Sequence, residues 1–439
     1  MELGKGAKSV SLEIALKTSL ILTAVATGYF GSFVQLVLAR PTIVDDNLDV
    51  QAVVGGLSSP TSMLFLDNNT ILVLEKEGNV RLVKNGVLQE RPVLQVPVKA
   101  ENERGLLGLA SSADINSPNK YNIFLYYTEG DPIRNRVFKY QWNEGTLVNP
   151  TLVLDLPAEP GYVHVGGKIV IGPDGYLYAV IGDLNHYGKL QNFPDWPPPD
   201  DTGSILRINP EDGSAAPYNP LASSDGNGDA LSKYYAYGIR NSFGLDFDPL
   251  TGNLWDTENG PSRFDEVNLV KPGFNSGWYR VMGPLSLSGE SEEDLVSFPG
   301  SHYADPLFSW ADPVGITDIE FLDSSYLGAK YTNNIFIGDF KLGNLYFLKM
   351  NENRDGISFD GTQQQSGLLD LIVNNDKELS SIKFGSGFGG ITDIETGPDG
   401  SLYVLSYDDA IEILPGGFLN ISSYTNGTIY RISPNNTAQ

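Results

Sequence analysis

The chain has 439 residues, and its 54 acidic and 29 basic side chains give a formal net charge of −25 at pH 7. Such an acidic chain is a poor partner for nucleic acid, because binding to phosphates requires a surplus of lysine and arginine. The absence of cysteine excludes disulfides, zinc–thiolate sites, iron–sulfur clusters and thiol nucleophiles.

The first predicted element is an N-terminal apolar helix. Three lysines precede an uncharged, mostly apolar stretch at 19–39, which has about the length of a helix that spans a bilayer. The basic flank is expected to stay in the cytoplasm, which places the rest of the chain outside. A cleaved signal peptide, and hence a secreted protein, is the alternative. We expect a cytoplasmic tip and membrane anchor at 1–44, one large domain at 45–433 and a short tail at 434–439.

Beyond residue 45 a strand–turn–strand unit recurs. Each copy has an apolar strand, a short turn of Asp, Gly or Pro, and a second strand that begins near an aromatic residue, as in "VIGPDGYLYAVIGD". Copies begin at residues 64, 109, 170, 245, 319 and 394. Six copies at spacings of roughly 45 to 80 residues predict an all-β fold, a six-bladed β-propeller with one four-stranded blade per copy. A large sandwich or two barrels would give no reason for the repetition.

In a propeller, the residues just before each inner strand meet at one end of the central channel. We therefore look for chemistry in "VPVKAENERGLLGLA", "YVHVGGK", "YGIRNSFG", "PVGITD", "GDFKLGN" and "GFGGITD". The first candidate is His164, because a histidine can accept a proton at neutral pH and Gly166 and Gly167 allow a close approach of backbone or ligand. A hydrogen-bonded histidine with a structural role is the alternative.

Two further stretches carry candidate groups. Arg240 and Asn241 could clamp a carboxylate or a developing oxyanion, or the arginine could tie adjacent blades together. Three carboxylates (Glu258, Asp265 and Glu266) surround a Gly-Pro turn and suit calcium, which prefers oxygen ligands, although acidic turns are also common on acidic surfaces. Lys341 lies in a turn between two apolar strands, where it could face the channel or the solvent.

Several motifs resemble those of the glucose/sorbosone dehydrogenase family of soluble quinoproteins, which includes aldose sugar dehydrogenases. The resemblance covers roughly residues 45 to 433 and rests on "RGLLGLA", "HVGGKIVIGPDGYLYAVIGD", "YGIRNSFGLDFDPLTGNLWDTENGPSRFDEVNLVKPGFNSGW", "GDFKLGNLYFLKM" and "ITDIETGPDGSLYVLS". It implies a six-bladed propeller that holds pyrroloquinoline quinone (PQQ) and calcium at its channel mouth.

The resemblance also implies roles for individual residues. His164 matches the family's base, which takes a hydroxyl proton as hydride passes from the sugar C1 to the quinone. Arg240 matches the arginine that stabilises negative charge on the quinone oxygen, and Asn241 its neighbour. Gly260 and Pro261 match the turn whose carbonyls hold the calcium of the cofactor. Glu266 matches a ligand of a structural calcium ion, and Lys341 a lysine that pairs with the quinone's carboxylates.

Three positions depart from the family pattern. Gly390 and Thr392 occupy the places of two arginines that grip the cofactor, and Glu103 stands where the family has glutamine. The cofactor is a tricarboxylate, so the loss of two cations would weaken its binding by orders of magnitude, taking roughly 1.5–3 kcal/mol per charged hydrogen bond. Lys383 and Arg280 are the predicted replacement cations.

The sequence thus predicts a membrane-anchored enzyme that oxidises aldose sugars to lactones with PQQ at the outer face of the membrane. One alternative is a propeller that binds calcium but no quinone and serves as a carbohydrate-binding or adhesion module at the cell surface. A calcium-assisted lactonase is a third possibility, because fold alone does not determine function.

Overall fold

The computed structural model describes residues 41–113, 121–222, 231–407, 411–413, 419–421 and 427–435. The predicted apolar helix at 19–39 lies outside these residues. Within them, no helix is long and apolar enough to cross a membrane.

The described strands form six sheets, here called blades I to VI, and one separate hairpin. Blade I contains β3 (Pro60–Asp67), β4 (Thr70–Glu75), β5 (Asn79–Lys84), β6 (Val87–Leu88) and β7 (Leu94–Gln95). Blade II contains β8 (Leu106–Ala113), β9 (Tyr121–Glu129), β10 (Arg134–Asn143) and β11 (Thr146–Leu156). Blade III contains β12 (Ile169–Ile171), β13 (Leu177–Ile181), β14 (Ser204–Ile208), β15 (Tyr234–Tyr237), β19 (Phe274–Asn275) and β20 (His302–Tyr303).

The other three blades are built in the same way. Blade IV contains β16 (Ser242–Phe247), β17 (Leu254–Glu258), β18 (Asp265–Val270), β21 (Phe308–Trp310) and β26 (Ile372–Val373). Blade V contains β22 (Ile316–Phe321), β23 (Ile335–Asp339), β24 (Asn344–Met350), β25 (Ile357–Ser358), β27 (Lys383–Ser386) and β1 (Thr42–Ile43). Blade VI contains β28 (Ile391–Thr396), β29 (Leu402–Ser406), β32 (Gly427–Pro434) and β2 (Leu48–Leu57).

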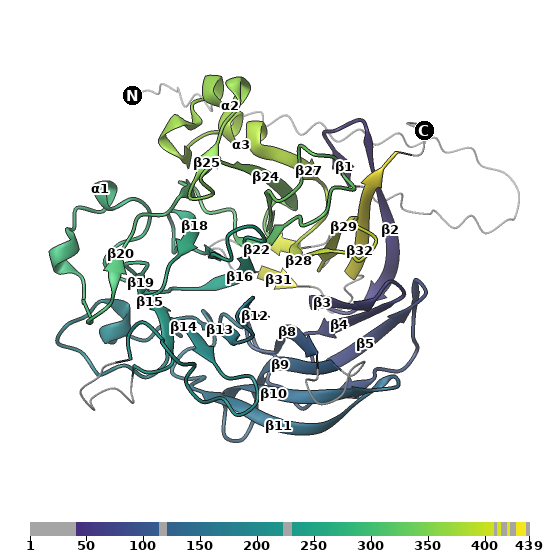
Figure 1. Cartoon of the computed structure of the whole chain (residues 1–439), viewed down its shortest axis with the longest axis horizontal. Helices are drawn as coiled ribbons and strands as arrows, with labels where there is room; N and C mark the ends of the chain where they lie inside the picture. Colours follow the sequence, from purple (N-terminus) through teal and green to yellow (C-terminus); the bar gives the residue numbers. More distant parts are fainter. Residues whose placement is uncertain are drawn as a thin grey trace, which may run out of the picture. The chain divides into compact units, whose positions relative to one another are not determined.

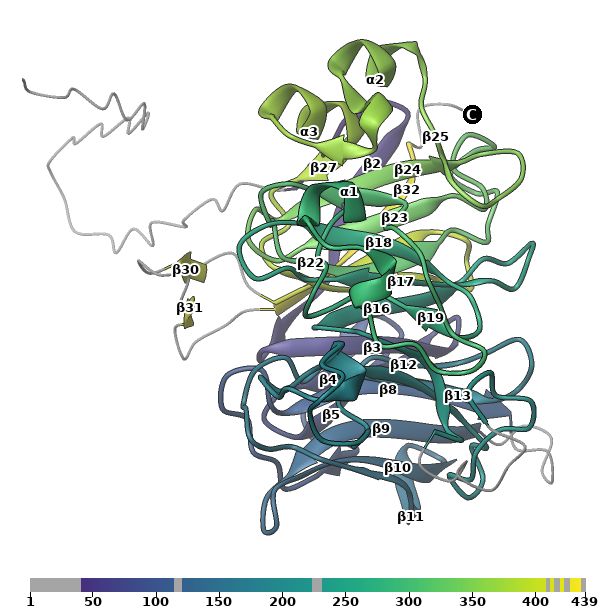
Figure 2. The same ribbon diagram turned by 90° about the vertical axis from the view of Figure 1, so that its left-hand side faces the viewer.

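Few helices interrupt this pattern. The α-helices are α1 (Leu285–Ser288), α2 (Gly361–Ser366) and α3 (Asp376–Ile382), and the 3₁₀ turns are η1 (Lys189–Gln191), η3 (Glu292–Asp294) and η4 (Leu368–Asp370). Figure 1 shows α2 and α3 beside the outer strands of blade V. The hairpin of β30 (Ile411–Ile413) and β31 (Leu419–Ile421) belongs to none of the six blades (Figure 2).

The inner strands β3, β8, β12, β16, β22 and β28 surround a common centre (Figure 1). Each contacts the inner strand of the next blade, and β28 contacts β3, so the ring is closed. The first and last parts of the described chain close it, because β2 pairs antiparallel with β32 within blade VI, with Gln51 opposite Arg431. The predicted all-β propeller is confirmed.

The repeated Gly-Pro-Asp-Gly turns explain why the inner strand of a blade folds back into the second strand. In the first of them, the Asp174 carboxylate accepts the N–H of Tyr176 at 3.2 Å, and Gly175 has a φ of +79°. The turn before β29 repeats this, with the Asp399 carboxylate accepting the N–H of Ser401 at 3.0 Å. An aspartate and a glycine with positive φ are the residues that such a turn requires.

Six apolar clusters fill the spaces between successive blades. Between blades IV and V, for example, Trp255 and Trp310 pack with Ile337 and Tyr346, and all four are fully buried. A fully buried side chain of this size contributes roughly 1.5–3 kcal/mol relative to an exposed one. The blades are therefore held to each other by packing, and the loops at the ends of the inner strands rest on a rigid base.

Charged groups fill the centre of the ring. The ammonium of Lys168, which directly precedes β12, lies 2.8 Å from the Asp318 carboxylate and 2.6 Å from that of Asp393. These side chains come from blades III, V and VI. Burial opposes the charge of Lys168, but the attraction of the two aspartates outweighs it and raises its pKa. This triad joins three blades at the axis.

Removal of the central cation should destabilise the fold. We expect Lys168→Met to lower the free energy of unfolding by about 3–5 kcal/mol, because it leaves two buried carboxylates without their partner. Urea unfolding followed by fluorescence and circular dichroism would measure this. Lys349→Met, on the exposed face of β24, is the matched control and should change stability by less than about 0.5 kcal/mol. Equal effects of the two substitutions would contradict a central role for the triad.

Candidate active site

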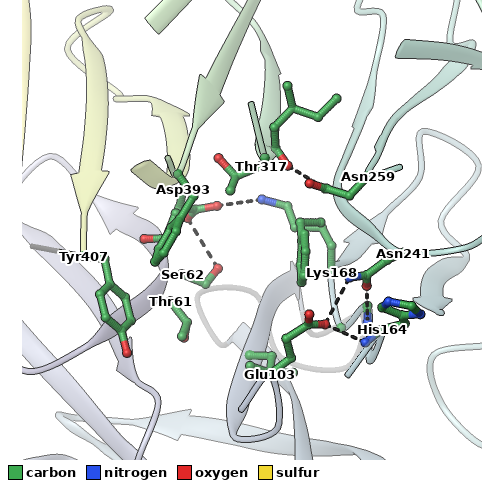
Figure 3. A pocket seen from close by; sticks show the side chains of 18 of the residues that line it. Thr61, Ser62, Glu103, His164, Lys168, Asn241, Asn259, Thr317, Asp393 and Tyr407 are labelled. Atoms are coloured by element: carbon green, nitrogen blue, oxygen red, sulfur yellow. Dashed lines mark hydrogen bonds and ion pairs between the residues drawn. The ribbon is translucent and has the colours of Figure 1, made fainter. Parts of the chain in front are cut away.

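A cavity of about 400 Å³ opens at the end of the ring where the inner strands begin. Loops from blades far apart in the sequence line it. Seven of the residues singled out in the sequence lie on its wall, namely Glu103, His164, Arg240, Asn241, Gly260, Lys341 and Thr392. Figure 3 shows Tyr407 and Thr61 on one side of this cavity and His164 and Asn241 on the other. Pro261 and Glu266 do not line it.

The histidine occupies a strained and tightly packed loop. His164 has a φ of +58°, in the left-handed region that residues other than glycine rarely adopt. The two glycines that follow are required by space, since a Cβ on Gly167 would lie 2.9 Å from Leu107 and one on Gly166 would lie 2.9 Å from the carbonyl oxygen of Val180. A non-glycine residue held at positive φ is often found at functional sites.

Hydrogen bonds fix the protonation of the imidazole. The Nδ1 of His164 lies 2.6 Å from the Asp183 carboxylate, and its Nε2 lies 2.7 Å from a terminal nitrogen of Arg240. A guanidinium can only donate, so Nε2 must be the acceptor. Nδ1 therefore carries the proton and donates it to Asp183. In this tautomer Nε2 carries the lone pair and faces the arginine at the cavity wall.

Asp183, which follows β13, is a functional residue that reasoning from sequence missed. Its second carboxylate oxygen accepts the indole N–H of Trp278 at 2.6 Å, and its side chain is 4% exposed. The "IGD" that ends the repeated unit is the signal that could have identified it. The tryptophan ring also lies beneath the Arg240 guanidinium, at 5.3 Å. Asp183 and Trp278, which do not line the cavity themselves, thus fix the positions of His164 and Arg240.

Arg240 is fixed by its own blade. One terminal nitrogen donates to the carbonyl of Asn259 at 2.7 Å, and its backbone N–H donates to Glu258 at 2.6 Å. Its buried Nε has no hydrogen-bond partner among the described residues. Burial lowers the pKa of Arg240 from its ordinary value. An ordered guanidinium without a carboxylate partner suits an anionic ligand.

Glu103 does not point an unbound carboxylate at the cavity. One of its oxygens accepts the backbone N–H of His164 at 2.7 Å and the side-chain amide of Asn241 at 3.0 Å (Figure 3). The Asn241 carbonyl in turn accepts the N–H of Gly166 at 3.3 Å. The two residues that the sequence placed against a cofactor therefore also hold the histidine loop in position.

Two further candidates lie at the rim. Lys341 is exposed, and its ammonium donates to the carbonyl of Pro313 at 3.0 Å. The turn that carries it is held by Asp339, whose carboxylate accepts the N–H of Gly343 at 2.9 Å and the hydroxyl of Tyr346 at 2.7 Å. Thr392 donates its hydroxyl proton to the carbonyl of Pro60 at 3.0 Å.

The predicted replacement cations are not at the cavity. Lys383 lies on β27 in blade V and lines a different hollow, and Arg280 lies 4.0 Å from Glu290. Neither belongs to the cavity wall. The prediction of these two residues rested on their charge and their position in the sequence, and neither property determines which way a side chain faces.

A model of the glucose/sorbosone dehydrogenase family matches residues 57–414. The chain belongs to this family. It is 26% identical over 379 residues to an aldose sugar dehydrogenase of Escherichia coli, covering 84% of this chain and 92% of that protein.

Solved structures agree. A glucose dehydrogenase-like oxidoreductase of Thermus thermophilus has a TM-score of 0.66 and 29% identity, covering 88% of this chain and 99% of that one. The PQQ-bound aldose sugar dehydrogenase of Streptomyces coelicolor has a TM-score of 0.64 and 23% identity, covering 90% and 100%. The last comparison shows the common fold.

The cavity fits the cofactor class of this family in size and chemistry. Phe243, Phe340 and Tyr407 contribute apolar walls suited to a planar ring system, and 400 Å³ lies within the usual range of ligand sites. PQQ carries three carboxylates. Lys341 and Arg240 provide two cations that have no carboxylate within 4 Å among the described residues. They would bind two of those carboxylates or quinone oxygens.

Oxygen ligands for a metal ion lie in blade IV. The loop at Gly260 is held by Asp265, which accepts its N–H at 3.1 Å, and Gly260 lines the cavity. Away from the cavity, neither oxygen of the fully buried Asp256 has a hydrogen-bond donor among the residues that the structure describes, and Glu266 lies on the adjacent strand. In the described ranges, no group of three or more His, Cys, Asp or Glu side chains is arranged to hold a metal ion.

Asp339 gives the lysine turn a pH dependence. Burial raises the pKa of this carboxyl from 3.8 to about 6. Its protonation therefore favours the folded state at low pH, and that contribution is lost as the pH rises through about 6. We expect wild-type stability to lose on the order of 2–3 kcal/mol between pH 4 and 7 through this group. In Asp339→Asn that part of the slope should be absent.

The measurement is urea unfolding of both proteins from pH 4 to 7.5. Asp360→Asn, at an exposed helix start, is the control and should follow the wild type. Parallel curves for Asp339→Asn and the wild type would show that Asp339 does not titrate in this range.

Proposed function

We propose that this chain oxidises aldose sugars to lactones with PQQ as its redox cofactor. The observation that carries the proposal is the imidazole of His164 at the cavity wall, with Nδ1 donating to Asp183 and Nε2 accepting from Arg240. When bound, PQQ accepts the hydride that leaves C1 of the sugar. The protein must supply the base, the positioning of the reactants and the neutralisation of negative charge.

His164 is suited to be the base. Nε2 would accept the proton of the C1 hydroxyl once that hydroxyl replaces Arg240 as its hydrogen-bond partner, and the positive charge that this creates would be stabilised by Asp183 at 2.6 Å. The Trp278 indole keeps the second oxygen of Asp183 occupied, so the carboxylate cannot turn away. In this role Asp183 is a positioning residue for the histidine.

Arg240 is suited to stabilise negative charge. A terminal nitrogen of Arg240 lies 2.7 Å from Nε2 of His164. A proton acceptor and a cationic hydrogen-bond donor are therefore adjacent at the cavity wall. A preorganised donor of this kind acts strongly where water is excluded. Asn241 and Thr392 lie on the cavity wall, and we assign both to cofactor contact together with Lys341 and Glu103.

Calcium is part of the proposal. Carbonyl oxygens of Gly260 and Pro261 would hold one ion at the cavity, where it would act as a Lewis acid. Glu266 would bind a second, structural ion, which would also satisfy the two oxygens of Asp256 that lack donors. We further propose that the domain acts outside the cytoplasm, anchored by the apolar stretch at 19–39 or released after its cleavage.

The main test uses the full chain with calcium and PQQ, an artificial electron-accepting dye and a panel of aldoses. We expect sugar-dependent dye reduction in the wild type. His164→Gln should lower kcat by about 10²–10⁴-fold, and Asp183→Asn should also lower it, because the amide can stabilise the wrong tautomer of the histidine. His302→Gln, at an exposed histidine of β20, is the matched control.

Calorimetric titration separates the outcomes. Both active-site variants should bind PQQ as the wild type does. Sugar binding without any quinone binding by the wild type would reject the oxidoreductase and support the carbohydrate-binding module. Lactone hydrolysis that needs calcium but no quinone would support the lactonase.

Calcium should stabilise the protein without any cofactor. At a concentration a hundredfold above its dissociation constant, a bound ion adds about 2.7 kcal/mol to the free energy of unfolding. We expect a chelator to lower the melting temperature of the wild type and added calcium to restore it. Glu266→Gln and Asp256→Asn should lose the part of this response that comes from the structural ion, whereas the exposed Asp212→Asn should keep the whole response. An unchanged response in Glu266→Gln would remove this residue from the calcium site.

A further inference from the structure

The cavity contains a cation that the family motifs do not assign. Lys76 directly follows β4, and its side chain lines the cavity together with Lys341 and Arg240. Its ammonium donates to the carbonyl of Ala100 at 2.7 Å, and no carboxylate of the described residues lies within 4 Å of it. The other two N–H groups of this ammonium therefore have no hydrogen-bond acceptor among the described residues.

The backbone and stem of Lys76 are firmly placed. Its N–H donates to the carbonyl of Ser59 at 3.0 Å, and its own carbonyl accepts the N–H of Leu106 at 2.9 Å. A Cβ on Gly105 would come within 2.6 Å of the Lys76 Cγ, so the stem packs directly against this glycine. The lysine is thus not a solvated surface group that merely reaches the cavity by chance.

Lys76 also lies near the place where cations are missing. Blade VI carries Gly390 and Thr392 in place of two arginines. Thr392 bonds the carbonyl of Pro60, and Lys76 bonds that of the preceding residue, Ser59. The lysine of blade I and the threonine of blade VI therefore approach each other through one short backbone segment. The Lys76 ammonium, which donates to the carbonyl of Ala100, lines the same cavity as Thr392.

We propose that Lys76 binds a carboxylate of the anionic cofactor and replaces the charge that Gly390 and Thr392 do not provide. The inference rests on the proposed function, because it takes the cofactor to be PQQ. It brings the number of cations at the cavity without a carboxylate partner, among the described residues, to three: Lys76, Arg240 and Lys341. Three cations match the carboxylates of a tricarboxylate ligand in number.

The test is calorimetric titration of PQQ into the full chain with calcium, which reads affinity and not turnover. Lys76→Met keeps the stem and removes the charge, and it should weaken binding by roughly 10- to 100-fold, the equivalent of one charged hydrogen bond. Lys76→Arg should restore most of the affinity. Lys84→Met, at the exposed end of β5 in the same blade, is the matched control and should bind as the wild type does.

A second substitution tests the replacement directly. Thr392→Arg in the Lys76→Met background returns a cation to the family position and should recover affinity. Thermal unfolding of each cofactor-free variant shows that it folds, and a variant that does not melt cooperatively is replaced by Lys76→Gln.

The possible failures are distinguishable. If the wild type does not bind PQQ, the proposed function is rejected together with this inference. If the wild type binds PQQ and both Lys76→Met and Lys84→Met bind equally well, Lys76 does not contact the cofactor, and the proposed function stands.

Discussion

The inner strand of every blade is the free edge of its sheet, and buried carboxylates join the edges of neighbouring blades at the IV–V, V–VI and VI–I junctions. Each of four inner-strand carboxylates accepts a backbone N–H from the inner strand of the next blade, at 2.6 to 2.9 Å: Asp246 from Phe321, Asp318 from Ile394, Glu320 from Thr396 and Asp393 from Met63. An unpaired backbone N–H at a buried edge would cost stability. These carboxylates supply hydrogen-bond acceptors for N–H groups that face the centre of the ring.

The same arrangement creates a problem of charge. Burial raises the pKa of Asp246 to about 7, and it also raises those of Asp318, Glu320 and Glu395. Lys168 offsets part of this cost by pairing with two aspartates from different blades. Since Lys168 and Asp393 also line the cavity, the ion pair that joins the blades is part of the wall of the candidate site.

The sequence was sufficient for the architecture because each blade repeats the same local chemistry. The turn aspartates, the positive-φ glycines and the apolar strands are all visible in one copy of the unit. It was also sufficient for residues that precede the inner strands, such as His164 and Arg240, which meet at one cavity. It was not sufficient for partners contributed by other parts of a blade, such as Asp183 and Trp278, because their role depends on where two loops cross in space.

A second position in the repeat supplies cavity residues that the sequence analysis did not select. In four blades the residue immediately after the second strand lines the cavity: Lys76 after β4, Asn259 after β17, Phe340 after β23 and Tyr407 after β29. The second strand runs back toward the end where the inner strand began, so its last residue returns to the channel mouth. An alignment of the six units at this position would have selected Lys76 before Lys383 or Arg280.

This geometry also shows why a cation that is absent from one blade can be supplied to the same cavity by a residue of another blade. A ligand at the mouth of the ring can be reached from the start of an inner strand or from the end of a second strand, and blades VI and I are joined there by the hydrogen bond from the Thr392 hydroxyl to the carbonyl of Pro60. What an anionic ligand requires is positive charge within hydrogen-bond reach, whichever strand supplies it. The carboxylate of Glu103, to one oxygen of which His164 and Asn241 both donate, opposes an anionic ligand, so the cations at the mouth must outweigh it. Loss of arginines from one strand is therefore not by itself loss of the site.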